Sequence, residues 1–264
     1  MNTKTGKQVR DLSREGTLTN PTAGLASGFV QANLVIVPEQ FAFDFLLFCT
    51  RNPKPCPVLE VLEKGNPLTS LTAKNADLRT DLPRYRVYQN EKLLDEPTDI
   101  LKYWRADFVS FLLGCSFTFD RALREGGVPV RHEEEGKNVP MYKTNIACKS
   151  AGVFQGPLVV SMRPMTTDLA LKATCITSRF PRAHGSPVHL GDPLQIGIPN
   201  ISKPDFGESV SIHSDEIPVF WACGVTPQAV AIASKIPFLI THSPGHMFVS
   251  DWTDQQLEGE ERVR

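Results

Sequence analysis

The alternation of short strands and short helices near the end of the chain limits the possible folds most. Residues 218–222 form an apolar run that predicts a strand, residues 226–234 follow with helical spacing, and residues 237–241 predict another strand. Earlier, residues 156–162 predict a buried strand and residues 166–177 a helix. Strands that alternate with helices favour a sheet with helices on both faces. The predicted class is therefore α/β, with mixed α+β elements.

The middle of the chain predicts a smaller α+β lobe packed on that sheet. Residues 85–88 alternate as a strand does, and a turn at residues 89–92 would make them part of a hairpin. Two helical pieces are expected at residues 100–113 and 116–124, separated by Gly114. These elements add to the sheet of the final third.

The chain shows no sign of separate domains. No internal repeat and no flexible linker interrupts the 264 residues, so a single unit over residues 1–264 with two interleaved lobes is expected. Six prolines within residues 181–219 predict turns and short strands. The polar residues 252–264 are expected to form a frayed tail.

Composition and charge exclude several classes of protein. The net charge is −1 and the pI about 6.6, whereas a nucleic-acid surface needs a basic excess. The most apolar stretch, residues 29–48, contains Asn33, Pro38, Glu39 and Asp44, which are too costly for a membrane span. The six cysteines are dilute and form no C-x-x-C pair, and the first residues lack the apolar core of a secretory signal. A cytoplasmic protein with reduced thiols and no membrane or nucleic-acid partner is expected.

A tight turn after the predicted strand 218–222 is the strongest candidate for an anion site. It contains Gly224, Val225 and Thr226, with Thr226 expected as the N-cap and Pro227 as the first residue of the helix. Free backbone N–H groups and the helix dipole at such a turn favour a carboxylate or a phosphate. The alternative is an ordinary capped helix that binds no ligand.

A second turn of this kind contains Cys115 and Ser116. If Ser116 caps the following helix, Cys115 lies beside a helix N-terminus, where a thiol has a lowered pKa and nucleophilic character. Cys223 precedes Gly224 in the first turn. Both cysteines are candidate catalytic residues, and the alternative is that such a cysteine is a small buried hydrophobe.

Two histidines after the last predicted strand are candidates for a general base. His242 and His246 lie in a segment that Pro244 and Gly245 interrupt. Both imidazoles are therefore expected at the sheet edge that carries Cys223, where either one can accept a proton from a substrate.

A metal site is the competing interpretation of the histidines. His184 and His189 are a second pair near glycine turns, and Asp192 or Glu216 would complete a set of ligands. Glycine and proline within that pair exclude the helical spacing of a zinc protease motif. Separate histidines bonded to nearby backbone are the simpler interpretation, so no metal and no cofactor are expected.

Arginine and amide side chains supply candidates for binding a substrate. Arg79 and Arg163 are the cations that would hold a carboxylate. Arg163 follows a strongly apolar strand and is equally suited to pairing with an acidic side chain of the protein itself. Asn138 and Tyr142 offer an amide and a phenol in an extended segment, which suits contacts to a polar ligand or an exposed edge strand. The predicted ligand is a small-molecule carboxylate.

Several strings of the sequence resemble those of the D-glutamate cyclase family. The similar strings are residues 20–24, 30–34, 51–57, 77–85, 113–117, 138–142, 159–164, 220–228 and 241–247. Lys143 and Asp120 stand where the family pattern has arginine and glutamate, and both preserve the charge. The resemblance implies a hydro-lyase of the single-module bacterial type that closes D-glutamate to 5-oxo-D-proline with loss of water, and so a role in glutamate metabolism.

Two other classes of function fit the same residues. One is a carboxylate-binding module without catalysis, and the other is a metal-dependent hydratase or hydrolase. A homo-oligomer is compatible with all three. The enzyme interpretation depends on one geometric expectation: the turns around Gly114, Gly224 and Pro244 meet at a common sheet edge and form an anion-accepting hollow beside an arginine.

Overall fold

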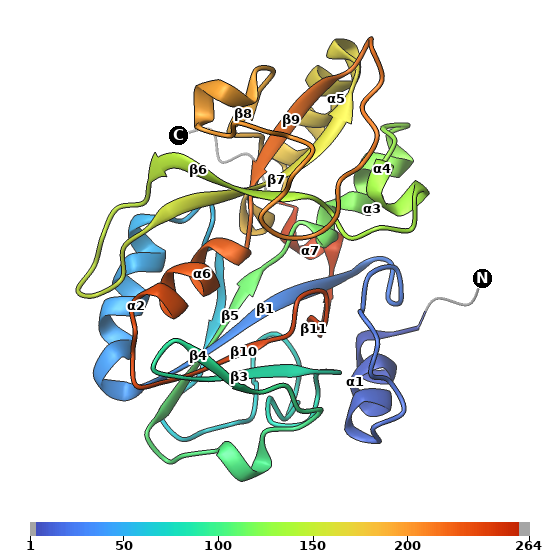
Figure 1. The fold of residues 1–264 in the computed structure, drawn as a ribbon. Coiled ribbons are helices and arrows are strands. Elements are labelled where there is room, and N and C mark those ends of the chain that lie inside the picture. The colour runs from blue at the N-terminus through green and yellow to red at the C-terminus, as the bar shows by residue number, and fades with distance from the viewer. Residues whose placement is uncertain (1–3, 259–264) are drawn as a thin grey trace, which may run out of the picture.

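Two antiparallel sheets organise the structure, a computed structural model that describes residues 4–258 (Figure 1). The large sheet has the order β2 (Val58–Val61), β5 (Phe108–Gly114), β1 (Phe29–Pro38), β10 (Phe238–His242), β3 (Tyr85–Gln89) and β4 (Lys92–Asp95), and β11 (Phe248–Thr253) also pairs with β1. The small sheet has the order β6 (Met141–Ala147), β7 (Pro157–Met165), β9 (Ile217–Ala222) and β8 (His189–Leu190).

Helices cover both sheets. The α-helices are α1 (Gly6–Arg14), α2 (Glu39–Arg51), α3 (Phe117–Glu125), α4 (Arg131–Glu134), α5 (Thr167–Ser178), α6 (Val225–Ala233) and α7 (Asp254–Leu257). Short 3-10 helices are η1 (Leu101–Tyr103), η2 (Pro181–Ala183) and η3 (Pro193–Ile196). None of the helices within residues 4–258 has the length and apolar character that a membrane crossing requires. The predicted mixed α/β class is confirmed.

β1 is the central strand of the large sheet, and its pairing explains where the loops gather. All of its residues after Phe29 are buried, which suits a strand covered on both faces. One edge of β1 pairs with β5 along its length, while the other edge pairs first with β11 and then with β10. Ala32 lies opposite Phe248, and Val35 lies opposite Thr241. The chain between β10 and β11 therefore leaves the sheet beside the middle of β1.

Aromatic packing fixes the layers around the large sheet. On one face α2 and α6 pack against it, and the ring of Phe45 lies 4.9 Å from that of Phe111 and 5.1 Å from that of Phe154, both edge to face. On the other face residues 62–82 and 100–104 cover the sheet, and there Phe108 of β5 stacks on Phe238 of β10 at 5.8 Å. The central strands β1 and β5 are therefore buried on both sides, whereas the edge strand β4 is exposed.

The small sheet has its own apolar cover. α3 and α5 pack on one face, where the rings of Phe119 and Trp221 lie 6.0 Å apart. α6 begins directly after β9 and passes from the small sheet to the large one (Figure 1). The site described below lies where these two sheets face each other.

One predicted element is wrong, and one segment differs from its expectation. Residues 100–113 were expected to be helical, but they form η1 and then β5. The apolar run of β5 is buried on every residue between β1 and β2, and such short buried runs do not distinguish a strand from a helix. Residues 252 and 253 end β11, residues 254–257 form α7, and the rest of the expected tail beyond residue 258 lies outside the described residues.

Candidate functional site

The side chain of Asn33, on β1, joins two of the three predicted turns. Its Nδ2 donates to the carbonyl of Gly114 at 2.9 Å and approaches that of Leu113 at 3.3 Å. On its other side the turn after β9 comes so close that a Cβ atom on Gly224 would lie 2.1 Å from Asn33 Nδ2. Only glycine fits at that position without a shift of Asn33.

The third turn reaches the same place from the other edge of β1. His242, the last residue of β10, accepts a hydrogen bond at Nδ1 from the backbone N–H of Leu34 at 3.1 Å. Gly245 in the following turn accepts one from the N–H of Thr22 at 2.8 Å, which fixes the N-terminal loop there. The three turns therefore meet as expected, although they do so beside the middle of β1 and not at the edge of a sheet.

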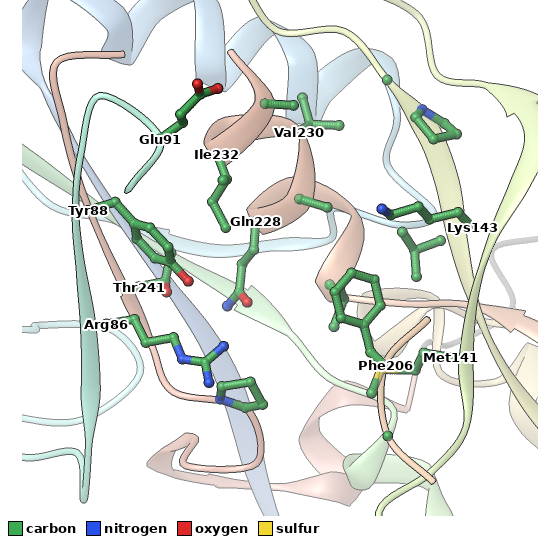
Figure 2. A pocket seen from close by; sticks show the side chains of 18 of the residues that line it. Arg86, Tyr88, Glu91, Met141, Lys143, Phe206, Gln228, Val230, Ile232 and Thr241 are labelled. Carbon is green, nitrogen blue, oxygen red and sulfur yellow. The ribbon is translucent and has the colours of Figure 1, made fainter. Parts of the chain in front are cut away.

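Two cavities adjoin this meeting point. We call the larger one the Gln228 cavity; its volume is about 790 Å³ (Figure 2). Its walls are mostly apolar and come from α6, β6, β7, β3 and the turns at residues 206–207 and 244. They contain Arg86, Tyr88, Glu91, Met141, Lys143, Gln155, Gly156, Pro157, Val159, Phe206, Gly207, Val225, Gln228, Ala229, Val230, Ile232, Ala233, Thr241 and Pro244.

We call the smaller one the His132 hollow; its volume is about 480 Å³. It lies between the N-terminal loop, the start of α3, α4 and the loop that follows, and the turn at residue 245. It is lined by Pro21, Ala23, Gly24, Phe117, His132, Glu133, Gly136, Lys137, Asn138, Glu208 and Gly245. Neighbouring residues of two turns, Pro244 with Gly245 and Gly207 with Glu208, separate the hollow from the cavity.

A buried ion pair lies behind the His132 hollow. Arg163 on β7 is fully buried, and its Nη2 and Nε both contact Oδ1 of Asp120 on α3, at 2.7 Å and 3.1 Å. The guanidinium also lies over the rings of Phe119 and Trp221, at 5.3 Å and 5.4 Å from their centroids. Buried charge is tolerated here because it is paired and bonded. The structure thus favours the pairing role of Arg163 over direct exposure to a ligand.

Asp120 and His132 leave polar atoms without partners beside that ion pair. Asp120 Oδ2, His132 Nδ1 and the hydroxyl of Thr118 are buried and make no hydrogen bond within residues 4–258. His132 Nε2 lies 4.0 Å from Asp120 Oδ2, although the two side chains are only 5% and 2% exposed. Most buried polar atoms in proteins are bonded, so a group of orphaned atoms at a hollow indicates a ligand site or a catalytic one.

Burial moves the two pKa values in opposite directions. Burial raises the pKa of Asp120 to about 6, and the charge of Arg163 opposes that rise. Burial lowers the pKa of His132 to about 3, and the charges of Arg163 and Arg124 lower it further. At neutral pH the imidazole is therefore neutral and has a lone pair to accept a proton, while the neighbouring carboxyl titrates close to neutrality.

The pKa values of the two predicted cysteines shift in the direction opposite to the one expected. Burial raises the pKa of Cys115 to about 12 and that of Cys223 to about 11. Ser116 makes no capping bond to α3, and its hydroxyl instead lies 3.4 Å from Nη2 of Arg163. The prediction of a lowered thiol pKa is therefore wrong, because desolvation outweighs the effect of the helix N-terminus.

The predicted histidines are engaged in hydrogen bonds. His242 is buried, its pKa is lowered to about 3 by burial, and its Nδ1 contacts both the Leu34 N–H and, at 2.7 Å, Nε2 of Gln228. The ring nitrogens of His246 face the carbonyls of Pro244 and Thr19, at 2.9 Å and 3.1 Å. Neither ring therefore offers a nitrogen that is free of neighbours.

The predicted binding residues are divided among several places. Asn138 lines the His132 hollow and Val225 lines the Gln228 cavity. Arg79 lines neither, and its guanidinium pairs with Asp77 at 2.7 Å. The hydroxyl of Tyr142 donates to the carbonyl of Ile201 at 2.6 Å.

The cap of α6 lies two residues earlier than predicted. The residue at the N-cap position is Gly224, and α6 begins at Val225. Thr226 instead exchanges hydrogen bonds with the backbone of Val159 on β7, with its hydroxyl 2.9 Å from the N–H and 3.1 Å from the carbonyl. The turn thus fastens α6 to the small sheet.

One group of side chains has the spacing of a metal site. Ligand atoms of Asp120, His132 and Glu133 lie within 4.8 Å of one another. However, Arg163 and Arg124 already bind the two carboxylates, and these positive charges oppose a cation. The predicted second pair of histidines bonds to backbone instead, His184 to the Lys54 carbonyl and His189 to that of Asp192, both at 2.8 Å.

Sequence reasoning gave no role to His132 or Asp120. The two residues are twelve positions apart on different helices, and no local motif contains both. A signal was nevertheless present, because Arg163 on an apolar strand needs a buried acid and Asp120 lies on the helix after the second predicted turn. Identifying the pair requires the packing of α3 against the small sheet.

Comparison with known proteins places the chain among close relatives. The model of the D-glutamate cyclase family matches residues 109–251. A protein of Thermoanaerobacter sp. strain X514 is 60% identical over 250 residues, 95% of this chain and 94% of its own length, and YcsI of Bacillus subtilis is 57% identical over 251 residues, 95% and 98%. Both carry the provisional name hydro-lyase. A solved nitrogen repressor-like protein of Methanococcus jannaschii has a TM-score of 0.38 at 11% identity, a likeness too low to support any argument.

Proposed function

Because this chain belongs to the D-glutamate cyclase family, we propose that it is a hydro-lyase that removes water from a small amino or carboxylic acid in the His132 hollow. The specific reaction we propose is the closure of D-glutamate to 5-oxo-D-proline. The observation that supports this site is the pair of orphaned buried atoms, His132 Nδ1 and Asp120 Oδ2, on a histidine that lines the hollow and an acid behind it.

The reaction needs a group that takes protons from the α-nitrogen of the substrate and delivers them to the departing oxygen of the γ-carboxyl. The α-nitrogen of the substrate forms a bond to the γ-carbon, one C–O bond of the γ-carboxyl breaks, and two N–H protons leave with that oxygen as water. A base must therefore take a proton from the ammonium group, and an acid must deliver protons to the departing oxygen. One histidine can do both in turn.

His132 is assigned that role, and Asp120 positions it. A proton on Nε2 would face Asp120 Oδ2, now 4.0 Å away, and would leave the Nδ1 lone pair for the substrate. Such contacts are often long without substrate and shorten in the complex. Arg163 fixes the carboxylate from behind through Oδ1. A bound carboxylate in the hollow would raise the pKa of His132 and make it a stronger base.

Lys137 is the cation that lines the hollow. Its Nζ bonds to Glu135 and to the carbonyl of Ser209, both at 2.8 Å, which fixes its position at the wall. Asn138 follows it and lines the same wall. These two side chains are assigned to the α-carboxylate of the substrate, whose orientation places the nitrogen near the γ-carbon.

The test is turnover by purified protein with a matched pair of histidine variants. D-Glutamate is incubated with enzyme, and 5-oxo-D-proline is separated and quantified; the reverse reaction starts from 5-oxo-D-proline. His132→Asn is expected to lose on the order of 100-fold or more in kcat/KM, as for removal of a general base. His189→Asn, on a histidine outside both cavities, is expected to keep the activity.

Three outcomes would contradict the proposal. Equal activity of the wild type and His132→Asn would show that the active site is not in the His132 hollow. Binding of D-glutamate, seen as a rise in melting temperature without product, would indicate a carboxylate-binding module. Stoichiometric bound metal with activity abolished by a chelator would indicate a metal-dependent hydratase or hydrolase.

A further inference from the structure

We propose that the Gln228 cavity is a second ligand site, separate from the His132 hollow, for an organic acid with an apolar chain or ring whose carboxylate binds Lys143. The cavity's volume, its apolar walls and the arrangement of its charged side chains support this assignment.

The walls suit an apolar body. Val225 and Ala229 come from a half-buried side of α6, buried Val230 lies deeper, and Val159 and Met141 continue the apolar surface on the small sheet. Figure 2 shows that the side chains of α6 and of the opposite strand leave open space between them. At about 790 Å³ the cavity is much larger than a five-carbon amino acid requires. A ligand that fills it must bring apolar surface of its own.

Of the charged side chains that line the cavity, Arg86 and Glu91 form ion pairs with other side chains, whereas Lys143 forms none within the described part of the chain. Lys143 on β6 and Arg86 on β3 point into the cavity from opposite sides (Figure 2). Arg86 pairs with Glu96 at 3.1 Å, and the acidic wall residue Glu91 pairs with Lys235 at 3.3 Å. The Nζ of Lys143 forms no ion pair within 4.0 Å among residues 4–258, although the backbone N–H of Lys143 donates to Oδ2 of Asp205 at 2.8 Å.

Lys143 is also placed to receive an anion. Its Nζ lies 5.7 Å from the centre of the Phe206 ring, which borders the same cavity. The ring holds the ammonium group beside apolar surface, so a bound carboxylate there would have an apolar neighbour for its chain. Gln228 also lines the cavity (Figure 2), and its amide Nε2 lies 2.7 Å from Nδ1 of His242.

The cavity and the hollow are distinct compartments. They share no lining residue, and the turns at residues 207–208 and 244–245 lie between them. Loss of His132 therefore leaves the walls of the cavity unchanged. Binding in the cavity can be tested whether or not the hollow turns over D-glutamate.

The experiment uses octanoate, an apolar chain with one carboxylate, and 1-octanol as its neutral counterpart, both titrated into the full-length protein by calorimetry. Octanoate is expected to bind more tightly than octanol. Lys143→Met, which keeps an apolar stem, is expected to weaken octanoate roughly fivefold, the size of an exposed ion pair, and to leave octanol unchanged. Lys149→Met, on an exposed lysine after the same strand and outside the cavity, serves as the matched control.

A second variant tests the location. Ala229→Trp narrows the cavity from α6 and is expected to weaken binding of both compounds, with the melting temperature as the check on folding. His132→Asn is expected to bind octanoate as the wild type does. The proposal is overturned if octanoate does not bind the wild-type protein, if Lys143→Met and Lys149→Met have equal effects, or if folded Ala229→Trp binds octanoate as tightly as the wild type does.

Discussion

The His132 hollow and the Gln228 cavity adjoin the same junction but are built from different chemistry. Behind the hollow lies a buried Arg163–Asp120 pair with orphaned polar atoms beside it, whereas the cavity is lined mostly by apolar side chains of α6 and β7. Orphaned polar atoms are costly to keep, and apolar walls are not. The comparison teaches that the larger space is suited to binding and the smaller one to proton transfer.

The largest expected effect comes from removing the acid behind the hollow, which should impair the hollow and leave the cavity unaffected. Asp120→Asn takes away the negative partner of Arg163 and leaves an uncompensated buried charge, which costs about 3–5 kcal/mol of stability. Turnover in the hollow should fall on the order of 100-fold, because His132 loses its charged neighbour.

Urea unfolding measures the loss of stability, and kcat/KM is measured below the new unfolding midpoint. Octanoate binding in the cavity serves as the control and should persist in the folded fraction. Full activity in Asp120→Asn would show that the ion pair is only structural.

The next effect is the pH dependence of turnover. The ionised form of Asp120 is the one that stabilises a protonated His132, and the pKa of Asp120 is raised to about 6 by burial. As the pH falls below that value the carboxyl becomes neutral, so kcat/KM should fall about tenfold per pH unit and level off above it. Rates measured from pH 4.5 to 8 give the profile.

Binding in the cavity should not follow this profile, since Asp120 lies outside its walls. A flat rate profile would contradict the assignment of Asp120, and a parallel change in octanoate affinity would contradict the separation of the two compartments.

The smallest effect concerns the thiol of Cys115, which lines neither compartment. Burial raises the pKa of Cys115 to about 12, so the thiol stays neutral at pH 7 and has no nucleophilic role. Cys115→Ala should change kcat/KM by less than about threefold and should leave octanoate binding unchanged, because small buried sites away from the reaction mainly affect stability. A loss comparable to that of His132→Asn would restore the thiolate interpretation.

The fold was more predictable than the site, for reasons visible in particular residues. The strands of the final third and the turns at Gly114 and Gly224 follow from apolar runs and glycine positions, which are local signals. The partner of Arg163 is not local. From the sequence, pairing of Arg163 with an acidic side chain was one of two interpretations, and only the packing of α3 on the small sheet identifies Asp120 as its partner.

The electrostatics of the site could not be predicted from local sequence because burial decides them. A cysteine next to a helix N-terminus predicts a lowered pKa, but full burial of Cys115 reverses the sign. His132 had no distinguishing neighbour in the sequence, and the triplet Glu133–Glu135 that follows it indicates a solvated turn. The role proposed for His132 depends on its Nδ1 and on Asp120 Oδ2, which make no hydrogen bond within the residues that the structure describes.

Along one edge β1 pairs first with β11 and then with β10, and this change of strand allows the loop between them to lie inside the molecule. A strand that loses its neighbour usually presents open backbone to solvent and invites other chains to pair with it. Here β11 pairs with β1 as far as Ala32 and β10 pairs with it from Val35, so the gap spans only two residues, and within it the N–H of Leu34 donates to Nδ1 of His242. The molecule thereby gains an interior opening without gaining an outer edge that could aggregate.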